Sequence, residues 1–350
     1  MLVTTRDPQR ALGDDAARVG LDMLERDDAL ALADKITDGC AEEDLAARDR
    51  VVLKELGALA VAVEMAARAV RKWTKTWTRY ETELKTHDAA LLEDPKLYGE
   101  AYDRGAFGAI DLSLERCTDP AARALLNSLA TMAPESAPMD WAEAGAGLTT
   151  GTLEADRAWE AIADGGFVRL TVTERAERQV SLHRLVHRRL AATMPARDRA
   201  GCAARMAPTV ETWLDETVDA SRLQVVELRV PHGIAILDAL AVDEKGLLWI
   251  RIADHLAHHF WHQGSYETAR RWLERALEAA ERLSAPEELR VAPQLSNLAL
   301  VLKDLGDANG ARPLLERAVA MAEKRLGPAH PNTRLFRKNL ASLEPPKTER

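Results

Sequence analysis

The stretch ARRWLERALEAAE at residues 269–281 returns as ARPLLERAVAMAE at residues 311–323, which begins 42 residues further along the chain. Both copies are rich in Ala, Leu, Glu and Arg, which favour helices. A fixed period of this length predicts helix-turn-helix units that stack and bury their faces against one another. The sequence therefore predicts an α-solenoid over residues 250–344, followed by a disordered tail at 345–350.

Several of the residues that repeat are small, and these small residues have a structural reason. Gly264 returns as Gly306, at a place where glycine can end the first helix of each pair. Ala269 and Ala276 return as alanine one period later. Their small side chains allow the two helices of a pair to cross closely, which supports the predicted stacking.

These residues and their period resemble the tetratricopeptide repeat, in the longer variety found in kinesin light chains. The loop RLGPAHPNT at residues 325–333 is similar to the linker between repeats of that variety. The resemblance implies a concave groove, formed by the first helix of each pair, that binds a segment of a protein partner. Self-association of the array is a further expectation. The positions that the resemblance places in the groove are Asp254, His255, His258, Trp261, His262, Asn297, Leu300, Lys303 and Asn339.

Four histidines crowd the first of these helices, in the stretch HLAHHFWH at residues 255–262. Pairs one helical turn apart could hold a metal through two imidazoles. No Glu follows as in H-E-x-x-H, and the sequence shows no obvious third ligand. A peptide groove is therefore the favoured interpretation and no metal is expected. Asn297 and Asn339 would hold the peptide backbone through their amides, and Trp261 would be its apolar anchor.

The composition limits the classes of partner. The 350 residues carry a formal net charge of −9, which disfavours phosphate backbones and anionic membranes as partners. The three cysteines are far apart in sequence and predict neither a disulfide framework nor a zinc knuckle. No apolar run is long enough to span a bilayer, and no signal-peptide pattern opens the chain. These features predict a cytoplasmic protein without a membrane or nucleic-acid partner.

Upstream of the repeats the sequence is mostly helical, with two strand-like regions. One is LVTT at residues 2–5, which is apolar and β-branched. The other is a hairpin of residues 167–173 and 179–182. A winged-helix domain is the favoured interpretation of this hairpin and its neighbouring helices, with a generic α+β patch as the alternative. The helices expected around the hairpin cover residues 120–132, 155–164 and 183–193.

A different stretch, RKWTKTWTRY at residues 71–80, predicts a core. Trp73, Trp77 and Tyr80 recur at helical spacing, so they share one face of a helix. The Lys and Arg residues between them can extend their charged ends to water. We expect a buried aromatic stripe here.

Several segments resemble parts of the NB-ARC ATPases, which belong to the STAND class of signalling switches. LVTTR at residues 2–6 resembles their sensor strand, and LGALAVAVEMAARAV at 56–70 resembles their GLPLAL helix. AWEAIADGGFVRL at 158–170 and SLHRLVHRRL at 181–190 resemble the winged-helix domain that ends in the MHD motif. LRVPHGIAIL at 228–237 resembles the connector before the repeats in bacterial members.

The resemblance assigns nucleotide contacts to four residues. Thr5 and Arg6 occupy the sensor position, where the arginine reads the terminal phosphate. Ala60 stands where the family has the proline that packs on adenine, and the substitution puts adenine binding in doubt. His183 aligns with the MHD histidine, which holds the β-phosphate of ADP in the family. The alternative for His183 is a half-buried cap on the helix that follows.

The phosphate-binding motif G-x-x-x-x-G-K-[ST] is absent from these 350 residues. That loop holds phosphates with successive backbone amides and a lysine, and nothing else in the sequence supplies them. We therefore expect a family member without its N-terminal P-loop part. As this chain it would be no enzyme and would hold no cofactor, whereas full-length members use ADP or ATP with Mg²⁺.

The predicted fold is mostly α, and the predicted function is a STAND-like regulatory scaffold whose repeats bind a protein partner. Two alternatives stay open. One is an ADP- or ATP-binding switch completed by the missing part, and the other is a DNA-binding regulator that uses the basic stretch RLVHRRL at 184–190. The predicted parts before the repeats are a remnant of a nucleotide-binding domain at 1–20, a helical domain at 21–103, a winged-helix domain at 104–195 and a helical connector at 196–249.

Overall fold

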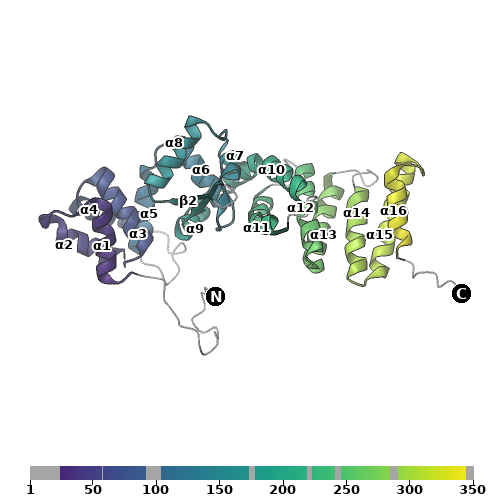
Figure 1. Cartoon of the computed structure of the whole chain (residues 1–350), viewed down its shortest axis with the longest axis horizontal. Coiled ribbons are helices and arrows are strands. Elements are labelled where there is room, and N and C mark those ends of the chain that lie inside the picture. Colours follow the sequence, from purple (N-terminus) through teal and green to yellow (C-terminus); the bar gives the residue numbers. More distant parts are fainter. Residues whose placement is uncertain are drawn as a thin grey trace, which may run out of the picture. The chain divides into compact units, whose positions relative to one another are not determined.

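The chain forms two compact units, Met1–Arg116 and Cys117–Arg350, and each is described by itself. Both are mostly α-helical in their described parts (Figure 1), as the sequence predicts. The strand predicted at residues 2–5 lies outside the described residues. The computed structural model describes residues 24–56, 58–91, 104–172, 178–218, 223–240, 246–283 and 291–343.

The first unit is built from short helices. Two of them, α2 and α3, continue into π-helical turns, η2 and η3. The described elements are α1 (Arg26–Thr37), η1 (Glu42–Asp44), α2 (Leu45–Arg50), η2 (Val51–Glu55), α3 (Ala60–Ala69), η3 (Val70–Thr74), α4 (Trp77–Leu91) and α5 (Arg104–Arg116).

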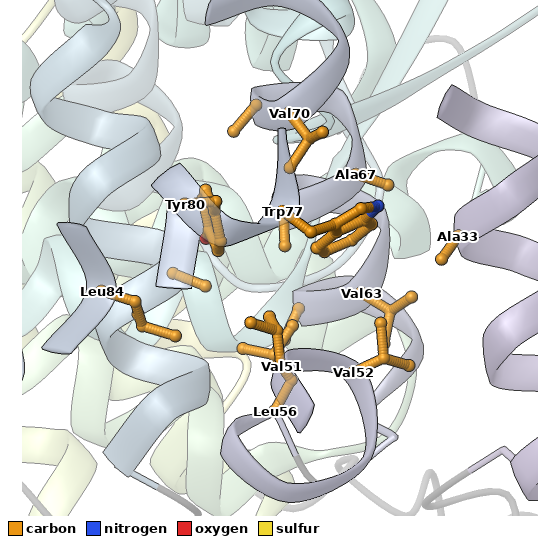
Figure 2. Packing of buried hydrophobic residues seen from close by; sticks show 14 of the residues in the cluster. Ala33, Val51, Val52, Leu56, Val63, Ala67, Val70, Trp77, Tyr80 and Leu84 are labelled. Carbon is orange, nitrogen blue, oxygen red and sulfur yellow. The ribbon is translucent and has the colours of Figure 1, made fainter. Parts of the chain in front are cut away.

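The core of this unit forms around Trp77, whose indole ring lies among aliphatic side chains in Figure 2. Trp77 and Tyr80 are fully buried and meet edge to face, with 6.2 Å between their ring centroids. Trp73 is partly buried against the same core. The predicted burial of these rings is therefore confirmed, but the single helix is not, because η3 ends at Thr74, Lys75 has a φ of +66° and α4 begins at Trp77. Ala109 and Leu112 of α5 also belong to this core, so α5 packs with the other helices of the first unit.

The second unit begins with helices around a small antiparallel sheet of order β1-β3-β2. Pairing of β2 with β3 confirms the predicted hairpin. The two-residue strand β1 and the helix α7 were not predicted, because a strand this short has no alternating pattern. The winged-helix domain expected from the sequence stays a prediction. The elements are α6 (Pro120–Thr131), β1 (Ala137–Pro138), α7 (Met139–Ala146), α8 (Leu153–Asp164), β2 (Val168–Val172), β3 (Arg178–Leu182) and α9 (Arg184–Thr193).

The rest of the second unit is a succession of helices, drawn from green to yellow in Figure 1. Each helix from α12 onward packs on the next, which confirms the predicted repeats. The helices are α10 (Ala196–Val218), α11 (Leu223–Ala239), α12 (Gly246–His262), α13 (Tyr266–Leu283), α14 (Val291–Asp304), α15 (Ala308–Leu326) and α16 (Pro331–Ala341).

The repeat-defining residues have the predicted structural roles. Gly264 and Gly306 follow the first helix of each pair with φ of +73° and +86°, a backbone conformation that favours glycine. Ala269 and Ala276 are fully buried, as are the alanines one period later. None of the helices among the described residues is long and apolar enough to cross a bilayer.

Candidate functional site

The first helices of successive repeats are α12, α14 and α16, and polar side chains link each of them to the next. We call the surface around these links the first-helix face. It comprises Asp254, His255, His258, Trp261 and His262 of α12, Asn297, Leu300, Lys303 and Asp304 of α14, and Asn339 and Ser342 of α16.

Two hydrogen bonds join α12 to α14. Gln294 Nε2 donates to Asp254 Oδ2 at 2.8 Å. Near the other end of the two helices, Trp261 Nε1 donates to Asp304 Oδ2 at 2.7 Å. Asp254 and Trp261 are thus held in place by the neighbouring repeat, at a face that remains partly open to solvent.

Two more hydrogen bonds join α14 to α16. Asn339 Nδ2 donates to Ser296 Oγ at 3.0 Å, and Lys303 Nζ donates to Ser342 Oγ at 3.1 Å. Asn339, a predicted peptide clamp, therefore uses its amide N–H to tie two repeats together. Asn297 and Leu300 lie half-buried on α14 between these links.

The same kind of link extends the face backward to α10. Arg251 of α12 forms an ion pair with Glu211, and His255 Nε2 lies 3.8 Å from Asp215 Oδ1. Both pairs join residues 40 positions apart, as Gln294 and Asp254 do. The helices α10 and α11 therefore precede α12 much as a further repeat would. Sequence reasoning missed Glu211 and Asp215 because residues 196–249 carry no visible period.

Asp254 is the most strongly perturbed carboxyl group on this face. Its Oδ1 atom is buried without a hydrogen-bond partner among the described residues, and so is Oε1 of Gln294. Burial raises the pKa of Asp254 to about 6, against the lowering effect of the Gln294 and Asn297 side chains. Sequence reasoning gave no sign of Gln294, which is a buried position of the second repeat.

Three rings gather at the end of α12, and we call His258, Trp261 and His262 the aromatic cluster. His258 meets Trp261 and His262 edge to face at centroid distances of 5.6 and 4.4 Å. His262 stacks on Trp261 at 5.9 Å with an interplanar angle of 27°. Both histidines are exposed and Trp261 is partly so. The arrangement offers flat aromatic surface beside the carboxylate of Asp304.

The residues assigned to nucleotide by resemblance lie in different parts of the chain. Thr5 and Arg6 are outside the described residues. Ala60 is exposed at the first position of α3, in the first unit. His183 is half-buried in the second unit, where its Nδ1 accepts the Leu185 N–H at 3.3 Å and caps α9.

A shallow pocket that the sequence did not predict lies open to solvent between α11 and α12, with a volume of about 570 Å³. Its walls are mostly apolar, with two polar side chains from α12 and the loop after it. The lining residues are Val230, Pro231, Ile234, His259, Phe260 and Gln263. In the part of the chain that the structure describes, no three His, Cys, Asp or Glu residues are grouped as metal ligands.

Comparison with protein families identifies the repeats. Residues 249–324 match the tetratricopeptide repeat family, in agreement with the period and the observed helix pairs. None of the curated proteins compared matches the sequence.

Among solved structures, one that the chain resembles is a signal transduction ATPase with numerous domains (STAND protein) that carries a tetratricopeptide repeat sensor, from Pyrococcus horikoshii. The sequences are 11% identical and the TM-score is 0.45 over 94% of this chain and 45% of that protein. The chain thus spans less than half the length of that structure, and a likeness this distant does not establish a common function. What the comparisons establish is that residues 249–324 are tetratricopeptide repeats.

Proposed function

We propose that this chain is a regulatory scaffold of the STAND type whose first-helix face binds an extended segment of a protein partner. The observation that supports this most is the continuous row of polar and aromatic side chains across α12, α14 and α16. Four hydrogen bonds between neighbouring repeats hold six of these side chains, so their positions are fixed before a partner arrives. Preorganisation of this kind lowers the entropic cost of binding.

The test is a matched set of single substitutions. A partner obtained by crosslinking and pull-down would be measured against Trp261→Ala and Asn297→Ala on the face. Arg188→Ala, an exposed change on α9, is the control. We expect each face variant to weaken binding about tenfold or more and the control to leave it unchanged. Binding that survives both face changes but falls with Arg188→Ala would assign the partner to the sheet-containing region instead.

We also propose that this chain is cytoplasmic and does not bind ADP or ATP tightly. Two observations favour the second point: no phosphate-binding motif occurs in the 350 residues, and His183 Nδ1 is engaged in capping α9. Calorimetry with ADP and Mg²⁺ tests it. Micromolar binding that disappears in His183→Asn, a change that keeps a capping acceptor, would contradict this proposal.

A further inference from the structure

The second unit builds the same side-chain arrangement twice: a pair of tryptophans, an arginine over their rings and an aspartate beside it. In the first, Arg229 lies 4.8 Å from the ring centroid of Trp213 and 5.5 Å from that of Trp141. Asp140 lies 3.9 Å from the Arg229 guanidinium. This arrangement joins α7, α10 and α11.

The second arrangement lies at the start of the repeats. Arg275 lies 4.4 Å from the ring centroid of Trp272 and 5.3 Å from that of Trp249. Asp238 accepts from the Arg275 guanidinium at 3.1 Å. In both places a planar cation meets aromatic faces and a carboxylate at once, which is the environment that guanidinium groups favour.

The aromatic cluster on the first-helix face has a similar make-up without the arginine: one tryptophan, a histidine in place of the second tryptophan, and an aspartate. Trp261 is stacked against His262, and Asp304 is fixed at the edge of the indole ring by a hydrogen bond. In the described portion of the chain, no lysine or arginine lies over the Trp261 ring. The neighbouring Lys303 donates to Ser342 on α16.

We infer that the aromatic cluster and Asp304 form a binding subsite for an arginine side chain supplied by the partner segment. The inference rests on the proposed function, because it names the chemistry of the segment that the first-helix face binds. The guanidinium stacks on the exposed part of Trp261, and it pairs with the carboxylate of Asp304.

The charges around the subsite favour a cationic segment over an acidic one. The exposed Asp304 lies on the face itself, and the exposed Asp215 of α10 lies beyond His255. The cationic Arg251 is already paired with Glu211. An acidic segment would meet these carboxylates with the same sign of charge, and the whole chain adds a net charge of −9.

The experiment uses a displayed library of random twelve-residue peptides, selected on the full chain. Enriched peptides are resynthesised and measured by fluorescence anisotropy. We expect them to contain an arginine whose replacement by citrulline weakens binding about tenfold, because citrulline keeps the shape and loses the charge. Replacement by lysine is expected to weaken binding about threefold, because an ammonium cannot stack as a plane.

The protein side is tested with variants matched in charge. Asp304→Asn removes an exposed carboxylate from the subsite, whereas Glu278→Gln removes one from the exposed side of α13. We expect Asp304→Asn and Trp261→Leu to weaken binding of the arginine peptides about fivefold to tenfold and Glu278→Gln to leave it unchanged. Circular dichroism of each variant checks that the fold is kept, and Asp304→Asn is the decisive change if Trp261→Leu perturbs packing.

The outcomes separate this inference from the proposed function. Enriched peptides without arginine, or arginine peptides insensitive to Asp304→Asn, would overturn the subsite while leaving peptide binding by the face intact. Failure to enrich any peptide would count against both. If the chain itself forms oligomers in sedimentation runs and Asp304→Asn dissolves them, the arginine comes from a second copy, and the inference of a separate partner is overturned.

Discussion

The two complete repeats share their frame and differ in what they present. Leu273 and Leu315 are buried at matching positions, as are the alanines of both pairs. At the exposed positions, Trp261 and His262 of the first repeat correspond to Lys303 and Asp304 of the second. The contrast shows that close helix crossing requires the same small residues in both repeats. The residues of the first-helix face are under no such requirement and can differ between repeats.

The two repeats also attach differently to the helix before them. Arg275 and Arg317 hold matching positions. Arg275 stacks on two tryptophans and pairs with Asp238, whereas Arg317 has an exposed ion pair with Glu281 at 2.7 Å. Arg275 therefore combines stacking within the first repeat with an ion pair to α11, whereas Arg317 offers an exposed ion pair to α13.

The largest expected effect is on the shared frame. Ala276→Leu and Ala318→Leu each add a bulky side chain to a fully buried helix crossing. We expect each to lower the free energy of unfolding by about 3 kcal/mol, measured by urea denaturation. Ala320→Leu, at an exposed position of α15, is the control. A large cost in one repeat alone would show that the frames are not equivalent.

The next largest effect is expected at Asp254, a carboxyl group that the second repeat lacks. Asp254 corresponds to Ser296, and burial raises the pKa of Asp254 from 3.8 to about 6. Because this pKa is raised on folding, its stabilising contribution is present below about pH 4 and is lost as the pH rises through 6. Asp254→Asn removes this loss, and its amide can donate to Gln294 Oε1 while its oxygen accepts from Nε2.

We therefore expect Asp254→Asn to raise the free energy of unfolding at pH 7 by as much as about 3 kcal/mol relative to its effect near pH 4. Urea denaturation at the two pH values measures this difference. Glu278→Gln, a change at an exposed carboxyl group of α13, serves as the control. An unchanged pH dependence in Asp254→Asn would mean that this carboxyl group titrates as it does in the unfolded chain.

Arg275 and Arg317, at matching positions of the two repeats, allow the two ion pairs with the preceding helix to be compared directly. Arg275→Ala removes a guanidinium from two aromatic rings and is expected to cost about 1 kcal/mol. Arg317→Ala removes an exposed ion pair and is expected to cost less than about 0.5 kcal/mol. Thermal unfolding of the two variants side by side measures the difference. If both variants lose the same free energy of unfolding, stacking of Arg275 on Trp249 and Trp272 adds nothing to stability.

The smallest effect belongs to the two turns. An added Cβ at Gly264 or Gly306 would meet no atom within 4 Å, so only the positive φ opposes Ala there. Gly264→Ala and Gly306→Ala are each expected to lower the free energy of unfolding by about 0.5 to 1 kcal/mol. Denaturant midpoints check this, and a much larger cost at one glycine would point to a constraint beyond its backbone conformation.

The sequence allowed prediction of those positions at which packing accepts only one kind of residue. Gly264 and Ala269 repeat because a left-handed turn and a close crossing exclude other side chains, so the period was visible in the sequence. The role of α10 was not visible, because the Glu211–Arg251 ion pair depends on how α10 packs on α12 and no repeated spacing marks it in the sequence. Gln294 gave no sign for a similar reason: its link to Asp254 depends on how two repeats stack.

The two arginine–tryptophan arrangements have a mechanical consequence for α11. Arg229 fastens one part of this helix to α7 and α10, and Asp238 fastens its far end to α13 through Arg275. Between them, His232 Nε2 lies 3.0 Å from the Ser136 carbonyl oxygen. Bending at the Arg229 end would have to pull its guanidinium off the rings of Trp141 and Trp213. The other end is held by the Asp238–Arg275 ion pair and by the hydrogen bond from Trp249 Nε1 to the Leu237 carbonyl. The helix is thus tied by stacking towards the sheet-containing region and by polar contacts towards the first repeat.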